Sequence, residues 1–155
     1  MEQQTNNKFT EIEQTFSKRR SYWMEWISDM NKCLKDMDSL VTLQSNVYVK
    51  RQEALDNYHT LAATLAKWTK SYKEHYAAMY KDIRMMKTSQ GATTYMFPTE
   101  SAIKDQIEAK LSDEKYLVDI MCSHLEYLDG TIKSIDGIIY AIQNRIKIEE
   151  IKIGK

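Results

Sequence analysis

The first 90 residues of this chain contain neither glycine nor proline, and an apolar residue returns in them at nearly every seventh position. These heptad positions hold Phe9, Phe16, Trp23, Met30, Met37, Tyr58, Leu65, Tyr72, Met79 and Met86. Apolar companions follow many of them three residues later. Alternating steps of three and four keep one stripe of an α-helix facing a neighbouring helix. The pattern therefore predicts long helices that pack along other helices, and it favours assembly over catalysis.

Two polar heptad positions, Gln44 and Arg51, interrupt this series. A single helix from Phe9 to Lys87 would be about 120 Å long, and it could bury its stripe only against other chains. Residues 43–50 read LQSNVYVK, in which serine, asparagine and β-branched valine weaken the helix propensity. We therefore expect two helices folded into a hairpin with a break near residues 43–50, and one long rod is the alternative.

The second half of the chain begins with a polar segment, residues 88–98, that contains a glycine and the only proline. Both residue types interrupt helices, so this segment is predicted to be a loop. Thr99 is of the type that caps a helix start, which predicts a short helix over residues 99–111. The tract that begins with Ser112-Asp113-Glu114 has a second such signature, and it predicts a long amphipathic helix to about residue 151.

Gly130 and Gly137 lie seven residues apart on one face of this last predicted helix. Glycine inside a helix is less favourable than alanine by up to about 1 kcal/mol. Two interpretations stay open: a partner helix approaches closely at the glycines, or the glycines face solvent.

These elements predict an all-α fold: an elongated helical hairpin or bundle with coiled-coil-like heptads, a loop, a short helix and a long C-terminal helix. The expected organisation is one domain in three parts. An N-terminal helical region covers residues 1–87, the loop covers residues 88–98, and a C-terminal oligomerisation region covers residues 99–155.

The charges balance, with 22 basic and 22 acidic residues, so net charge alone makes no case for nucleic acid. The N-terminus lacks the pattern of a signal peptide, and no apolar run approaches the length of a membrane span. Cys33 and Cys122 lie in helical apolar patterns, which is typical of reduced, buried thiols. We expect a cytoplasmic protein, or a viral protein in a host cytoplasm, that has no membrane association.

The sequence gives little support to catalysis. The histidines His59, His75 and His124 are dispersed, and none has a second ligand at metal-binding spacing. Glycine-rich phosphate-binding loops and paired-cysteine motifs are absent from the sequence. We therefore expect no enzymatic activity, no cofactor and no metal.

The segment Lys67–Lys87 holds six basic residues against two acidic ones, and Tyr72, Tyr76 and Tyr80 follow each other at steps of four. Cations can follow a phosphate backbone while aromatic rings stack on unpaired bases. The alternative is an ordinary solvated face beside a packing stripe. The residues predicted to bind DNA are Lys70, Lys73, Lys81, Arg84, Lys87, Tyr76 and Tyr80.

The last predicted helix carries a continuous apolar stripe. An uncovered stripe of this kind favours association between copies of the chain. We expect a homo-oligomer whose subunit interface is formed by Leu128, Ile132, Ile135, Ile139, Ile142 and Ile146.

The order of elements from about residue 55 onward also suggests a family. A basic and aromatic segment precedes the loop with its glycine and proline, and a short helix leads to the tract Ser112-Asp113-Glu114-Lys115. The long last helix then carries Asn144-Arg145 and ends near Gly154. Over roughly residues 55–155 this arrangement resembles the UvsY-like recombination mediators of bacteriophages.

The resemblance implies a ring-like homo-oligomer that binds single-stranded DNA. In that family the protein helps to load the phage recombinase and to displace the single-strand-binding protein, and it hydrolyses no nucleotide. Two alternatives use the same heptads without DNA. One is a structural assembly protein, such as a scaffold, a chaperone or a coiled-coil adaptor. The other is a helical hairpin that binds one protein partner.

Overall fold

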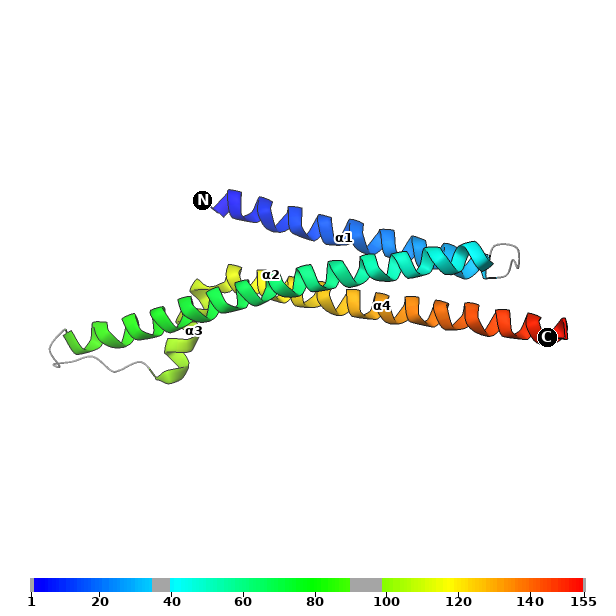
Figure 1. The fold of residues 1–155 in the computed structure, drawn as a ribbon. Helices are drawn as coiled ribbons and strands as arrows, with labels where there is room; N and C mark the ends of the chain where they lie inside the picture. The colour runs from blue at the N-terminus through cyan, green and yellow to red at the C-terminus, as the bar shows by residue number, and fades with distance from the viewer. Residues whose placement is uncertain (1, 35–39, 90–98, 155) are drawn as a thin grey trace. The chain divides into compact units, whose positions relative to one another are not determined.

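In a computed structural model the described residues are 2–34, 40–89 and 99–154, excluding the side chains of 2–8, 41 and 85–89. They form helices α1 (Glu2–Cys33), α2 (Leu40–Ser89), α3 (Glu100–Lys110) and α4 (Ser112–Lys152) (Figure 1). Within these ranges there is no β-strand. The predicted all-α class is therefore confirmed.

The chain folds back between α1 and α2, but the predicted break near residues 43–50 is wrong because that segment lies inside α2. Leu43 and Val47 are buried there. Burying such a side chain is worth about 1.5–3 kcal/mol, more than the propensity differences of about 0.7 kcal/mol that disfavour helix. Arg51 marks no break either, since its Nε donates to Oδ1 of Asp136 on α4 at 2.6 Å.

The helix starts predicted after the loop are confirmed. The Oγ1 atom of Thr99 accepts a hydrogen bond from the backbone N–H of Ala102 at 3.3 Å and caps α3. Leu111 alone separates α3 from α4, and Asp113 and Glu114 lie in the first turn of α4, where acidic side chains are favourable. Of the predicted loop, Thr88 and Ser89 belong to α2, and residues 90–98 lie outside the described residues.

The chain divides into two compact units. Unit 1 comprises Met1–Leu61 and Ser123–Lys155, and unit 2 comprises Ala62–Cys122. Helices α2 and α4 each contribute to both units. The predicted division into parts at residues 87 and 98 within one domain stays a prediction.

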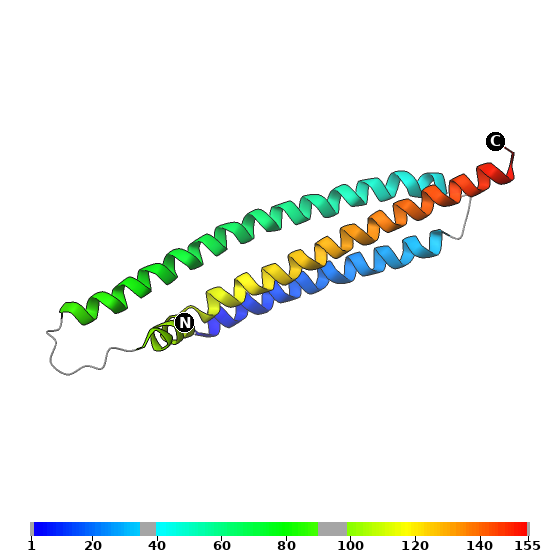
Figure 2. The ribbon, with the colours of Figure 1, turned by 90° about the horizontal axis from the view of Figure 1, so that it is seen from below.

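Unit 1 packs α1, the first part of α2 and the last part of α4 side by side (Figures 1 and 2). The Tyr127 hydroxyl of α4 donates to the carbonyl oxygen of Arg20 on α1 at 3.0 Å. Buried positions of α2 recur at intervals of seven at Leu40, Val47, Ala54 and Leu61, three residues after the heptad positions, and a coiled coil stays a prediction. The buried apolar residues of unit 1 are Phe16, Trp23, Leu40, Leu43, Val47, Ala54, Leu61, Leu128, Ile132, Ile135, Ile138 and Ile142.

The glycines of α4 face open space rather than a partner helix of this chain. A Cβ atom built at Gly130 or Gly137 meets no described heavy atom within 4 Å, and neither residue has a positive φ. The solvent-facing interpretation therefore holds within unit 1.

Replacing Gly130 and Gly137 together by alanine should raise the free energy of unfolding by about 1–2 kcal/mol, because alanine loses less backbone entropy in a helix. Urea unfolding followed by circular dichroism measures this. The Gly154→Ala variant is the control, since Gly154 has a φ of 77° that disfavours a side chain. Destabilisation by the double change would show that the two glycines are packed after all.

Candidate nucleic-acid interface

The tyrosines of α2 in unit 2 pack against α3. Ile103, Ile107 and Leu111 form a buried cluster, and partly buried side chains from α2 cover it. Those side chains are Tyr72, Tyr76, Met79, Tyr80 and Ile83. The steps of three and four that separate them place them on one face of the helix. The tyrosines therefore act as packing residues of unit 2.

Tyr80 is held further by the first turn of α3. Its hydroxyl donates to the Glu100 carboxylate, at 2.9 Å to Oε1 and 3.0 Å to Oε2. The rings of Tyr72 and Tyr76 lie 6.3 Å apart between centroids. Part of the face that Tyr76 and Tyr80 share is therefore covered by α3, and the prediction that they stack on DNA bases stays a prediction.

Arg84 is engaged by the same glutamate. Its guanidinium forms an ion pair with Glu100 and lies over the Tyr80 ring, 5.0 Å from the centroid. Both members of the pair are about half exposed, at 55% and 58%. Ion pairs this exposed contribute about 0–1 kcal/mol, so the pair can exchange for another anion at little energetic cost.

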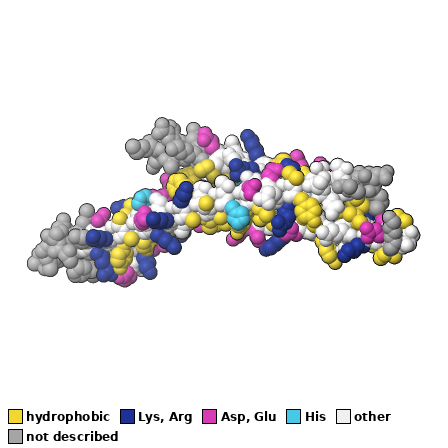
Figure 3. All heavy atoms as spheres, in the orientation of Figure 1, with side chains coloured by type: hydrophobic (Ala, Val, Ile, Leu, Met, Phe, Trp, Pro, Cys, Tyr) yellow, Lys and Arg dark blue, Asp and Glu magenta, His cyan; other side chains and the backbone are white. Residues whose placement is uncertain are grey.

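Three of the predicted DNA-binding lysines of α2 are free of such packing. Lys70, Lys73 and Lys81 are exposed. At 3.6 residues per turn, these three and Arg84 fall within an arc of roughly 80° along about 21 Å of helix. In Figure 3 basic side chains gather over the C-terminal half of α2. Four of the predicted cations thus start from one arc of α2, whereas the side chain of Lys87 lies outside the described part.

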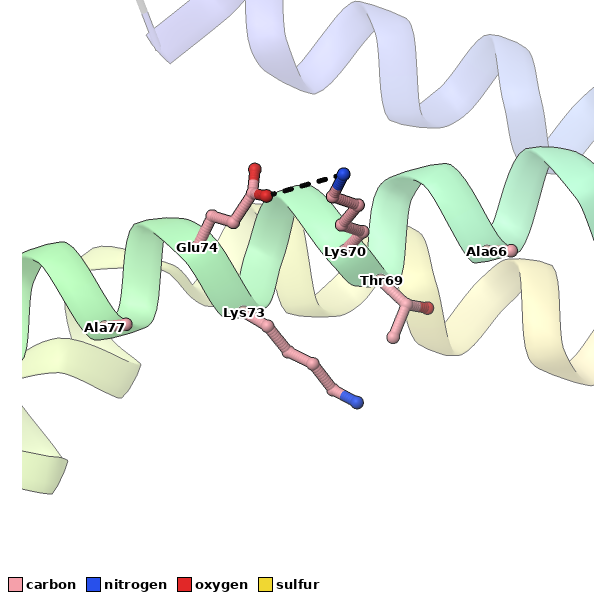
Figure 4. Close-up of a pocket in the computed structure, with 6 residues that line it drawn as sticks. All are labelled: Ala66, Thr69, Lys70, Lys73, Glu74 and Ala77. Carbon is pink, nitrogen blue, oxygen red and sulfur yellow. Dashed lines mark ion pairs between the residues drawn. The ribbon is translucent and has the colours of Figure 1, made fainter.

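A shallow hollow lies between two of these lysines. Its lining includes Thr69 and two residues with small side chains, Ala66 and Ala77, which project little from the helix. Figure 4 shows Lys70 extending toward Glu74 and Lys73 extending on the other side. The Nζ atom of Lys70 is 3.8 Å from Oε1 of Glu74, and both side chains are largely exposed. Flanking cations over a low surface suit an extended anion better than a compact ligand.

Among the described residues, no three histidine, cysteine, aspartate or glutamate side chains converge to hold a metal ion. His75 instead joins α2 to α4, with its Nδ1 2.8 Å from Oε1 of Glu114. The histidine is 56% exposed. This contact tethers two helices of unit 2.

The apolar stripe of α4 is occupied within the chain. Leu128, Ile132, Ile135 and Ile142 are buried in the core of unit 1, and Ile139 and Ile146 are half-buried. The role predicted for the four buried residues in a subunit interface is therefore corrected: the fold-back of α1 and α2 supplies the cover that other copies were expected to supply. Homo-oligomerisation itself stays a prediction.

Two residues that matter here were not singled out from the sequence. Glu100 lies in the first turn of α3, and its contacts with α2 depend on how α3 folds back. His124 is buried in α4, and its position three residues after Met121 and four before Leu128 places it on the apolar stripe. That spacing could have identified His124 as a core residue.

Comparison with protein-family models, with curated proteins and with solved structures finds no match for this chain. In the part of the chain that the structure describes, no helix is both long enough and apolar enough to cross a membrane.

The Glu100→Gln variant should bind single-stranded DNA several-fold more tightly at 50 mM salt if Arg84 can serve as a phosphate contact. The change removes one negative charge and frees the guanidinium. Fluorescence anisotropy with a labelled oligonucleotide measures the affinity. Glu108→Gln is the matched control, because it removes the same charge from α3 at a residue whose Oε2 lies 3.8 Å from the Nζ of Lys115. Equal affinities of the two variants would assign Arg84 a purely structural role.

Proposed function

We propose that this protein is a non-enzymatic, oligomeric single-stranded-DNA-binding protein that acts as a recombination mediator. The observation that carries this proposal is the exposure of Lys70, Lys73 and Lys81 on one side of α2. Hereafter these three residues are called the lysine face. The resemblance of the chain to the UvsY-like mediators adds the partners, which are a phage recombinase and a single-strand-binding protein. The proposed place of action is the cytoplasm.

The packing of Tyr76 and Tyr80 against α3 changes how the protein is expected to bind DNA. Because Tyr76 and Tyr80 are partly buried against α3 while the lysines are exposed, we expect phosphate contacts to contribute more to binding than base stacking. Phosphate contacts carry no sequence information and are strongly salt-dependent. The affinity is therefore expected to depend little on the base sequence.

An anisotropy titration with a labelled oligothymidine tests the proposal. Three phosphate contacts per chain give a log–log salt slope of about −2, and each further cation, such as Arg84, steepens it. Binding at 50 mM salt that weakens with this slope supports the proposal. Absence of binding at 50 mM salt by the intact protein contradicts it.

A structural assembly protein is the second candidate, favoured by the intrachain contacts of Tyr80 and Arg84 with Glu100. It would use the helices only for protein contacts. Both candidates predict oligomers, so a mass measurement does not separate them, whereas the oligonucleotide titration does.

A further inference from the structure

His124 occupies an unusual position in the core of unit 1. It is 1% exposed, and neither Nδ1 nor Nε2 has a hydrogen-bond partner among the described residues. Its ring stacks on Phe16 of α1, with centroids 4.1 Å apart and planes at 14°. On its other neighbour, Tyr127 of α4, the centroids are 6.0 Å apart and the planes at 5°. The imidazole is thus part of the contact between α1 and α4.

Such a site tolerates only the neutral imidazole. A protonated ring would carry a charge and two donors into apolar surroundings, where unpaired polar groups are strongly unfavourable. Two cations of α1 act electrostatically on the ring, with the larger effect from Arg20 and the smaller from Arg19. Both disfavour a positive charge on His124. Burial, followed by these two arginines, lowers the pKa of His124 to about 4.

We propose that His124 is an acid-sensitive latch between α1 and α4: the neutral ring holds α1 on α4, and protonation releases it. Release would expose the stripe of α1 that contains Phe16 and Trp23, together with the facing stripe of α4. This inference concerns unit 1 and does not rest on the proposed DNA binding.

The sign of the effect follows from the pKa values of the two states. In the released state the pKa of His124 returns toward its ordinary value of 6.5. Above that pH both states are neutral and the latch is fully effective. Between 6.5 and about 4 the released state takes up the proton first, so the opening constant rises by about 20-fold from pH 7 to pH 5 and by up to about 300-fold below pH 4.

Hydrogen exchange of the intact protein tests the latch, with rates corrected for the intrinsic pH dependence. The protection of amides in α1 should fall by about 20-fold from pH 7 to pH 5. His124→Phe and His124→Leu should remove this dependence. His59→Gln, a change at an exposed histidine of α2, should keep it. Protection in α1 that does not change with pH in the parent, or a change that persists in both His124 variants, overturns the proposal.

Nuclear magnetic resonance titration of the imidazole in the parent decides the matter even if both variants fail to fold. A pKa of His124 below 5 supports the latch, and a pKa near 6.5 overturns it.

Discussion

The Trp23→Ala variant is expected to lose about 3–5 kcal/mol of unfolding free energy. Trp23 is 1% exposed in the core of unit 1, and its ring meets that of Trp26 edge-on at 6.3 Å. Truncation removes a large apolar surface and leaves a cavity that rigid helices fill only in part. For a chain of this size, this corresponds to a fall of the melting temperature by about 6–20 °C.

Thermal unfolding followed by circular dichroism measures this loss. Met24→Ala is the matched control, because it changes the next residue of the same helix, whose side chain is 64% exposed. Exposed substitutions typically change stability by about 0.5 kcal/mol or less. Equal melting temperatures of the two variants would mean that α1 does not pack in unit 1 as described.

Neutralising the lysine face should have the largest effect on DNA binding. In the triple variant Lys70→Gln, Lys73→Gln and Lys81→Gln, three phosphate contacts are lost. At 50 mM salt this lowers the affinity for an oligonucleotide by about two orders of magnitude, and it makes the log–log salt slope less steep by about 2. Anisotropy titrations of parent and variant between 50 and about 200 mM salt measure both quantities.

The control for this variant carries the same change of net charge elsewhere. Lys104, Lys110 and Lys147 are exposed on α3 and α4, and their replacement by glutamine should leave the affinity within a few-fold of the parent. Sedimentation shows whether either variant changes the mass of the protein. A similar loss of affinity in both variants would indicate a general charge effect with no defined interface.

The helical class and the starts of α3 and α4 could be predicted because each depends on local information. Thr99 caps α3 through its own side chain, and the heptad spacing survives in the buried positions Val47, Ala54 and Leu61. Such signals require no knowledge of what lies far along the chain.

The position of the first break depended on tertiary contacts. Residues 43–50 look weak as a helix, yet Leu43 and Val47 are held by the core of unit 1. Asp38 and Ser39 directly precede Leu40 in the sequence, and aspartate and serine favour helix starts. They therefore indicate the start of α2 better than residues 43–50 do. Because Met37 is apolar and occupies the next heptad position, the heptad pattern continues up to this residue and does not indicate a helix start after it.

The sequence predicted the exposure of the lysines better than it predicted the surroundings of the tyrosines, and the binding roles of both stay predictions. Exposure of Lys70, Lys73 and Lys81 follows from helix geometry alone. The engagement of Tyr80 and Arg84 by Glu100 requires α3 to turn back onto α2, which no local pattern encodes. In the same way, the stripe of α4 could be recognised as an interface, but its partner could not be assigned to this chain or to another copy.

Lysine acetylation footprinting with bound oligonucleotide tests the central claim most directly, because it reads each lysine by mass spectrometry in the unmodified sequence. We expect Lys70, Lys73 and Lys81 to be protected several-fold in the complex, while Lys104, Lys110 and Lys147 react as in the free protein. The proposed interface would be contradicted if the lysine face stayed fully reactive with oligonucleotide bound. Protection of only the lysines of α4 would contradict it as well.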